Sequence, residues 1–222
     1  MRLWVLGIGL AIVLLSCKEE KDRSISINKI LVIGNSITIH PPDPSIGRNA
    51  NWGMAASEAD QDYFSLLKDN LQSYFPDLEM IRENVYPFER QFETIDFEQY
   101  SHLREFEAEV IIIRLGENIK DAELSNWNLA ESIQDFAFYL GTTNTKFIIA
   151  TTFWPSPNVN EQLRHVASQN HWEFVDISAF GSNPANMAIG QFEDNAVASH
   201  PNDQGMLAIS KAFSTKILAI EL

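Results

Sequence analysis

The sequence contains one cysteine, few basic residues and no apolar run as long as the ~20 residues that a bilayer-spanning helix needs. Cys17 has no second cysteine with which to pair, so the hydrophobic core must hold a folded domain together without an internal disulfide. Lys and Arg number 16 against 30 Asp and Glu, a formal net charge of −14 over 222 residues. So acidic a surface repels phosphate backbones, which argues against a nucleic-acid partner.

The spacings of common metal and nucleotide sites are also missing. The five histidines are scattered, and the sequence has no His-Glu-x-x-His, Cys-x-x-Cys or Gly-x-x-x-x-Gly-Lys motif. We therefore expect no metal ion and no phosphate-binding loop. What the sequence does have is 45% hydrophobic residues, a proportion that suits one globular domain.

The amino terminus has the pattern of a secretory signal. A basic residue is followed by 13 apolar residues at positions 3–15 and then by a small residue. The four residues that end at Cys17, Leu-Leu-Ser-Cys, resemble the bacterial lipobox, in which the thiol is lipidated and the chain is cleaved just before it. We predict a lipoprotein signal peptide over residues 1–16 and lipidation of Cys17. A cleaved signal beside an incidental cysteine is the alternative.

These features divide the chain into three parts. Residues 17–27 are rich in charge and are expected to form a solvated tether, and residues 28–222 form the domain. An aspartate directly after the predicted lipidation site would favour the inner membrane. This sequence has Lys18 at that position, which favours the outer membrane of a Gram-negative bacterium. We therefore expect a cell-envelope protein that is anchored to a membrane through the lipid on Cys17.

Strand and helix patterns alternate along the domain. Four short, mainly apolar segments predict strands, at residues 29–33, 110–113, 146–150 and 173–177, and residues 78–82 show a weaker pattern for a fifth. Apolar residues at helical spacing predict helices over residues 64–74, over 129–140, around 163–167, and after Asn202 and Asp203. The first of these helices has a possible cap at Ser57, with Asp60 three residues later. This alternation predicts an α/β fold with a doubly wound, mostly parallel sheet covered on both faces. Ligands of such sheets bind at the carboxyl ends of the strands.

Polar residues suited to acyl chemistry follow the predicted strands. Ser36 comes two residues after Gly34, which ends the first strand, and Asn118 follows the third. A serine hydroxyl becomes a nucleophile only if a base takes its proton and donors hold the developing oxyanion. His200, just before the last helix, is the candidate base, and the Asn118 amide and the Gly53 backbone N–H are candidate donors. Taken alone, Ser36 would be an ordinary turn serine.

Four sequence blocks together resemble the SGNH hydrolases, also called the GDSL esterases and lipases. In chain order, the blocks are Gly34-Asn35-Ser36-Ile37, Gly53, Gly116-Glu117-Asn118 and His200-Pro201-Asn202. The resemblance covers about residues 29–217. It implies a three-layer α/β/α sandwich around a five-stranded parallel sheet of the flavodoxin-like type. It also implies Ser36 as nucleophile, His200 as base, and an oxyanion hole made by the Ser36 and Gly53 N–H groups and the Asn118 side chain, with no cofactor.

One departure from this family concerns the residue that orients the histidine. The family usually places an Asp three residues before it, whereas this sequence has Val197, which cannot accept a hydrogen bond. Asp194 and Glu193 are candidates for that role if the loop folds back, and Asp176 is a third, although a structural role suits it better. A backbone carbonyl is the other alternative, and it would leave a Ser-His dyad.

The sequence therefore favours a serine esterase that hydrolyses short acyl esters, with O-acetyl groups on carbohydrates as the class implied by the resemblance. Its partner would be a small-molecule or glycan ester. The missing acid motivates a second reading, a catalytically weak or inactive lipoprotein that binds glycans or acyl ligands on the same fold. Acyl transfer to a second sugar is a third. The sequence leaves two roles open for Arg114, at the end of a predicted strand. It could bind a substrate carboxylate or balance the charge of nearby acids.

Overall fold

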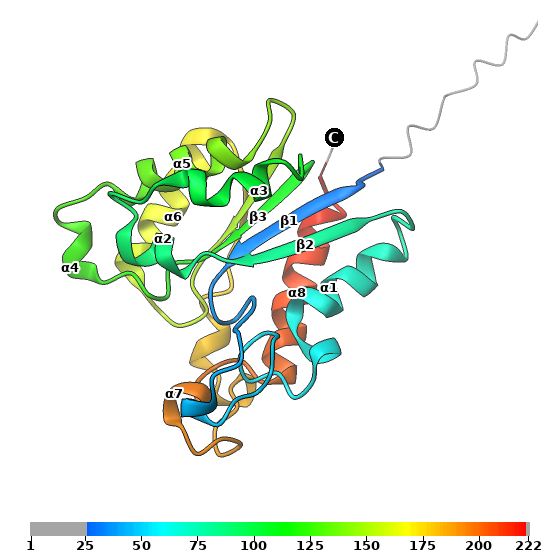
Figure 1. Cartoon of the computed structure of the whole chain (residues 1–222), viewed down its shortest axis with the longest axis vertical. Helices are drawn as coiled ribbons and strands as arrows, with labels where there is room; N and C mark the ends of the chain where they lie inside the picture. Colours follow the sequence, from blue (N-terminus) through cyan, green and yellow to red (C-terminus); the bar gives the residue numbers. More distant parts are fainter. Residues whose placement is uncertain (1–25, 221–222) are drawn as a thin grey trace, which may run out of the picture.

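The computed structural model describes residues 26–220 and contains one parallel sheet of five strands in the order β2-β1-β3-β4-β5 (Figure 1). The strands are β1 (Lys29–Gly34), β2 (Glu79–Asn84), β3 (Val110–Arg114), β4 (Lys146–Ala150) and β5 (Glu173–Val175). All four strand pairs are parallel. The predicted fold class and all five predicted strands are confirmed.

Helices cover both faces of this sheet, which explains why the central strands consist almost entirely of buried branched residues (Figure 1). One face is covered by α1 (Tyr63–Gln72) and α8 (Asp203–Ile217). The other face is covered by α2 (Tyr86–Gln91), α3 (Ser101–Arg104), α5 (Leu129–Leu140) and α6 (Pro157–Asn170). Two single-turn helices, α4 (Asp121–Leu124) and α7 (Asn195–Ala198), lie in loops. Short 3-10 turns occupy Pro44–Ile46, Ala59–Gln61, Phe97–Tyr100, Phe180–Ser182 and Pro184–Asn186.

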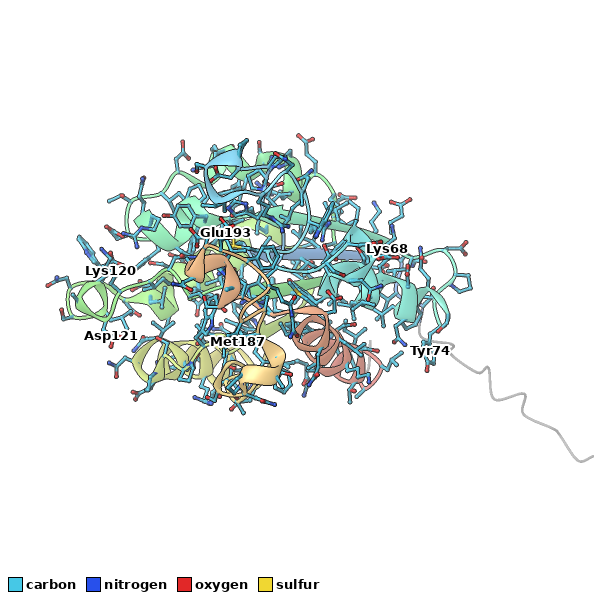
Figure 2. The ribbon with its side chains drawn as sticks, turned by 90° about the horizontal axis from the view of Figure 1, so that it is seen from below. Lys68, Tyr74, Lys120, Asp121, Met187 and Glu193 are labelled. Carbon is cyan, nitrogen blue, oxygen red and sulfur yellow. The ribbon has the colours of Figure 1, made fainter. Side chains whose placement is uncertain are left out.

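The first long helix begins later than its sequence pattern predicts. Asp62, rather than Ser57, is the N-cap of α1, and its carboxylate accepts the Ser65 N–H. Ser57 instead hydrogen-bonds to Asp203 at the start of α8. Tyr74 lies beyond the last residue of α1 and is exposed at one edge of the molecule (Figure 2). The cap prediction was wrong because Asp62 is held by tertiary partners that local sequence does not show.

The strand register brings three loops to one edge of the sheet. Gly34, the last residue of β1, pairs with Asn84 at the end of β2 and with Arg114 at the end of β3. A side chain at Gly34 would come within 2.6 Å of the Arg114 carbonyl oxygen, so only glycine permits this close approach. Whatever follows these three strands therefore meets at their carboxyl ends.

The predicted signal peptide, the predicted lipidation site Cys17 and most of the predicted tether lie outside the described residues. Within residues 26–220, no helix is both long enough and apolar enough to span a bilayer.

Candidate active site

Ser36 and His200 meet at the carboxyl ends of the strands although 164 residues separate them in sequence. The Ser36 Oγ lies 3.0 Å from the His200 Nε2. Ser36 stands in the turn that follows β1, and His200 stands between α7 and α8. Both side chains are half-buried. The distance is that of a nucleophile and its general base.

The second ring nitrogen of His200 faces a backbone carbonyl. Its Nδ1 lies 2.7 Å from the carbonyl oxygen of Ala196, four residues earlier on α7. Because a carbonyl oxygen only accepts, Nδ1 must carry the hydrogen, and Nε2 is left with the lone pair that Ser36 requires. The main chain therefore selects the tautomer that a carboxylate selects in a serine triad.

The surroundings of His200 favour its neutral form. Burial lowers the pKa of His200 to about 4, and the positive charge of Arg114 contributes in the same direction. The hydrogen bond to the Ala196 carbonyl opposes this shift but does not cancel it. Trp154 adds to the enclosure, since its ring meets the imidazole edge-on with centroids 5.0 Å apart, and its Nε1 donates to the Ser199 carbonyl.

We expect a direct NMR titration of the His200 imidazole to show the Nδ1-protonated tautomer at neutral pH and a midpoint at about pH 4. Since an unfolded histidine titrates near 6.5, the unfolded chain binds more protons between these two values, and stability should fall as pH drops through that interval. A His200 midpoint at or above 6.5 would contradict this description of the base.

The acids proposed to orient His200 have other roles. Asp194 is the N-cap of α7 and accepts the N–H groups of Ala196 and Val197. Glu193 is exposed on the loop beside α7, near the centre of the face in Figure 2. No carboxylate among residues 26–220 hydrogen-bonds to His200. Of the alternatives that the sequence left open, Asp194 and Glu193 are therefore corrected and the backbone carbonyl is the one observed, because the α7 turn places the Ala196 carbonyl there.

Val197 and Asp176 are structural residues. The Val197 side chain is buried in a small apolar cluster with Met54 and Ala188. Asp176 accepts hydrogen bonds from Ser178 and Arg164, which lower its pKa to about 2. The preference for a structural role at Asp176 agrees with these contacts.

The expected donor at Gly53 is not free. Its N–H lies 3.0 Å from Oδ2 of the fully buried Asp62, to which it donates, and the same carboxylate pairs with Arg82. Asp62 thus consumes the hydrogen that the resemblance assigned to the oxyanion. The assignment of Gly53 to the oxyanion hole is corrected for this reason.

Two of the expected donors remain at the site. The Ser36 N–H donates no hydrogen bond within residues 26–220. The Asn118 amide donates one hydrogen to Glu89 at 2.7 Å and keeps its second hydrogen. Asn118 lines the same cavity as Ser36 and His200. An oxyanion at this site would have a backbone and a side-chain donor.

A buried polar network lies beneath these residues. Arg114, which has no exposed surface, donates to Asn35 and pairs with Glu117. Asn35, next to Ser36, donates to both Glu117 and Glu89. Burial raises the pKa of Glu89, and the neighbouring charge of Glu117 raises it further. Arg114 therefore balances nearby acids, which decides between the two roles left open by the sequence.

The cavity above this network has a volume of about 670 Å³. Its walls combine the candidate catalytic groups with apolar side chains, among them Ile46, Met54, Pro87 and Trp154. A larger hollow of about 1120 Å³ lies by the first residues of β4 and β5, at the opposite end of the sheet. None of the candidate site residues lines that hollow.

Comparison with solved structures identifies relatives of this architecture. A variant of the acetyl xylan esterase Axe2 from Geobacillus stearothermophilus aligns with a TM-score of 0.54 and 20% identity, over 90% of this chain and 98% of that one. The psychrotrophic esterase EstA from Pseudoalteromonas sp. aligns with a TM-score of 0.51 and 13% identity, over 86% of this chain and 97% of that one. The chain has the SGNH hydrolase fold.

A third structure with this fold belongs to a longer protein. CEX, a two-domain esterase active on acetylated mannans, aligns with a TM-score of 0.58 and 16% identity, over 86% of this chain and 48% of that one. A scan of protein-family models and a search of curated proteins found no match. At these identities the SGNH hydrolase fold is shared, and the activity has to be argued from the site.

Sequence reasoning missed Glu89. Glu89 lies on α2, a helix of six residues that no apolar periodicity predicted. The available signal was its position, because Glu89 follows β2 by five residues and must lie near the edge where Ser36 emerges.

Proposed function

We propose that this protein is a serine esterase that hydrolyses short acyl esters through a Ser36–His200 dyad. The observation that carries the proposal is the 3.0 Å contact between Ser36 Oγ and His200 Nε2, with Nδ1 held by the Ala196 carbonyl. The half-buried hydroxyl lines an open cavity, so a substrate carbonyl can approach it.

In the first half of the reaction, Ser36 Oγ attacks the ester carbonyl and His200 Nε2 takes the hydroxyl proton. The carbonyl oxygen becomes an oxyanion that the Ser36 N–H and the free hydrogen of Asn118 stabilise. The C–O bond to the alcohol then breaks, and His200 returns its proton to the leaving oxygen. Water next attacks the acyl-serine with His200 again as base, which releases the carboxylic acid and restores Ser36.

The dyad should be slower than a full triad. A carbonyl fixes the tautomer of His200 as a carboxylate does, but its dipole stabilises the imidazolium less than a full negative charge. The lowered pKa of His200 also predicts a slower reaction, because the imidazole holds the proton taken from Ser36 weakly. Its advantage is that the base stays unprotonated well below neutral pH.

We propose O-acetyl groups on carbohydrates as the substrate class. Two proteins with this fold act on acetylated xylan and acetylated mannans, according to their descriptions. An acetyl group is small, and a cavity of about 670 Å³ leaves room for sugar rings beside it. Trp154 on the cavity wall adds an aromatic ring of the kind on which sugar rings pack.

The test measures hydrolysis of p-nitrophenyl acetate and acetate release from acetylated xylo- and manno-oligosaccharides. We expect turnover of both substrates, and we expect a fluorophosphonate to label Ser36 and no other serine. Peptide mass spectrometry locates the label. If no ester is turned over and Ser36 resists the label while the oligosaccharide still binds, the protein is a glycan-binding member of this fold.

A further inference from the structure

Glu89 is a buried carboxylate that accepts hydrogen bonds from both halves of the candidate site. Its Oε1 accepts the Gly116 N–H, and it also accepts Asn35 Nδ2 at 3.1 Å, beside the nucleophile. Its Oε2 accepts Asn118 Nδ2 at 2.7 Å, on the oxyanion side. The side chain has no exposed surface, so water does not compete for these hydrogen bonds.

The contact with Asn118 determines which end of the amide meets the substrate. A side-chain amide has a donor end and an acceptor end of nearly the same shape, and a half-turn exchanges them. With Glu89 in place, the exchanged orientation would set the Asn118 Oδ1 against a carboxylate oxygen. Only the orientation with Nδ2 toward Glu89 is compatible, and it leaves the second hydrogen of that NH2 group for an oxyanion.

The backbone around Asn118 is held by the same helix. Arg90, the next residue on α2, donates to the Asn118 carbonyl oxygen at 2.6 Å. Gly116 has a φ of 126°, so the turn that leads to Asn118 depends on a backbone conformation that few other residues adopt. The Glu89 hydrogen bond to the Gly116 N–H stabilises this turn.

We propose that Glu89 is a positioning residue for ester hydrolysis, acting by fixing the donor orientation of the Asn118 amide and by joining the Gly116–Asn118 turn to the Ser36 turn. This inference rests on the proposed function, because an oriented amide matters only if an oxyanion forms.

The first test is Glu89→Gln, which keeps the shape but replaces one acceptor oxygen by an NH2 group. The substituted side chain can no longer accept hydrogen bonds from both sides, so the Asn118 amide loses its fixed orientation. We expect kcat for p-nitrophenyl acetate to fall about 10- to 100-fold with KM changed less than about 3-fold, as for a partial loss of one oxyanion donor. The matched control is Glu109→Gln, whose carboxylate accepts backbone N–H groups at the opposite end of the sheet. Glu109→Gln should retain the wild-type kcat.

The second test is a double-mutant cycle with Asn118→Ala. If Glu89 acts through Asn118, Glu89→Gln should cost much less in the Asn118→Ala background than in the wild type. Multiplicative effects on kcat would overturn the inference, and so would a folded Glu89→Gln enzyme with wild-type kcat.

A measurement on the unmodified protein covers the case in which Glu89→Gln does not fold. The Asn118 side-chain hydrogen that Glu89 accepts should exchange with solvent more slowly than its partner on the same nitrogen. Equal, fast exchange of both hydrogens would refute the fixed amide. A wild-type protein that hydrolyses no ester refutes the proposed function itself, whereas an active wild type with a fully active Glu89→Gln variant refutes only the role of Glu89.

Discussion

Ser36→Ala should lower kcat/KM for p-nitrophenyl acetate by at least about 10³-fold and leave the fold intact. The substitution removes the attacking oxygen, whereas the oxyanion donors and the cavity remain, so only a small residual rate over water is expected. The Ser36 Oγ contacts His200 Nε2, and the neutral imidazole can hydrogen-bond to water in its place. Circular dichroism and steady-state kinetics on the same preparation measure the two effects.

The matched control for this experiment is Ser178→Ala. Ser178 also donates its hydroxyl hydrogen, but to Asp176 beyond the end of β5 and outside the cavity. Its loss should leave kcat/KM unchanged. A Ser36→Ala protein with more than about a tenth of the wild-type rate would show that the nucleophile is not Ser36.

Arg114→Met should lower the free energy of unfolding by about 3–5 kcal/mol at neutral pH. Arg114 is completely buried and is the positive charge that faces Glu117 in the network shared with Glu89. Without it, two carboxylates remain in a space that excludes water, and their desolvation is no longer compensated. Urea denaturation gives the difference directly.

The same loss should shrink as pH falls, because protonation neutralises Glu89, whose pKa is already raised by burial. Arg164→Met is the control, since Arg164 pairs with Asp176 where both side chains are about half exposed, and it should cost less than about 1 kcal/mol. If Arg114→Met lowers the free energy of unfolding by no more than Arg164→Met does, the buried network contributes little to stability.

The sheet could be predicted because the central strands β1, β3 and β4 contain runs of buried apolar residues, whereas β2 has only Met80 and Ile81 among polar residues and gives a weaker signal. The register that pairs Gly34 with Asn84 and Arg114 could not be predicted, because the parallel order leaves the position of each strand along its neighbour open. The start of α1 could not be predicted, since Asp62 owes its capping position to Gly53 and Arg82 as much as to the helix.

The site divides in the same way. Ser36, Asn118 and His200 could be found from block order at the strand ends, and the structure brings all three to one cavity. Gly53 was a wrong assignment because a buried carboxylate nine residues later takes its hydrogen. Glu89 was not predicted as a site residue, because an acidic residue in a short polar segment is usually exposed on the surface. Its burial depends on hydrogen-bond donors that follow β1 and β3, namely Asn35, Gly116 and Asn118, and no local pattern contains them.

The Ala196 carbonyl that holds the imidazole has one further consequence. A main-chain atom is present whatever amino acid is encoded at that position, so no single codon change can delete the group that orients the base. It also never gains or loses a proton. What can change is the geometry of the one-turn helix that presents it, and the apolar packing of Val197 therefore becomes an indirect control on turnover. Enlarging or shrinking that side chain would adjust the alignment of the base without touching any reacting group.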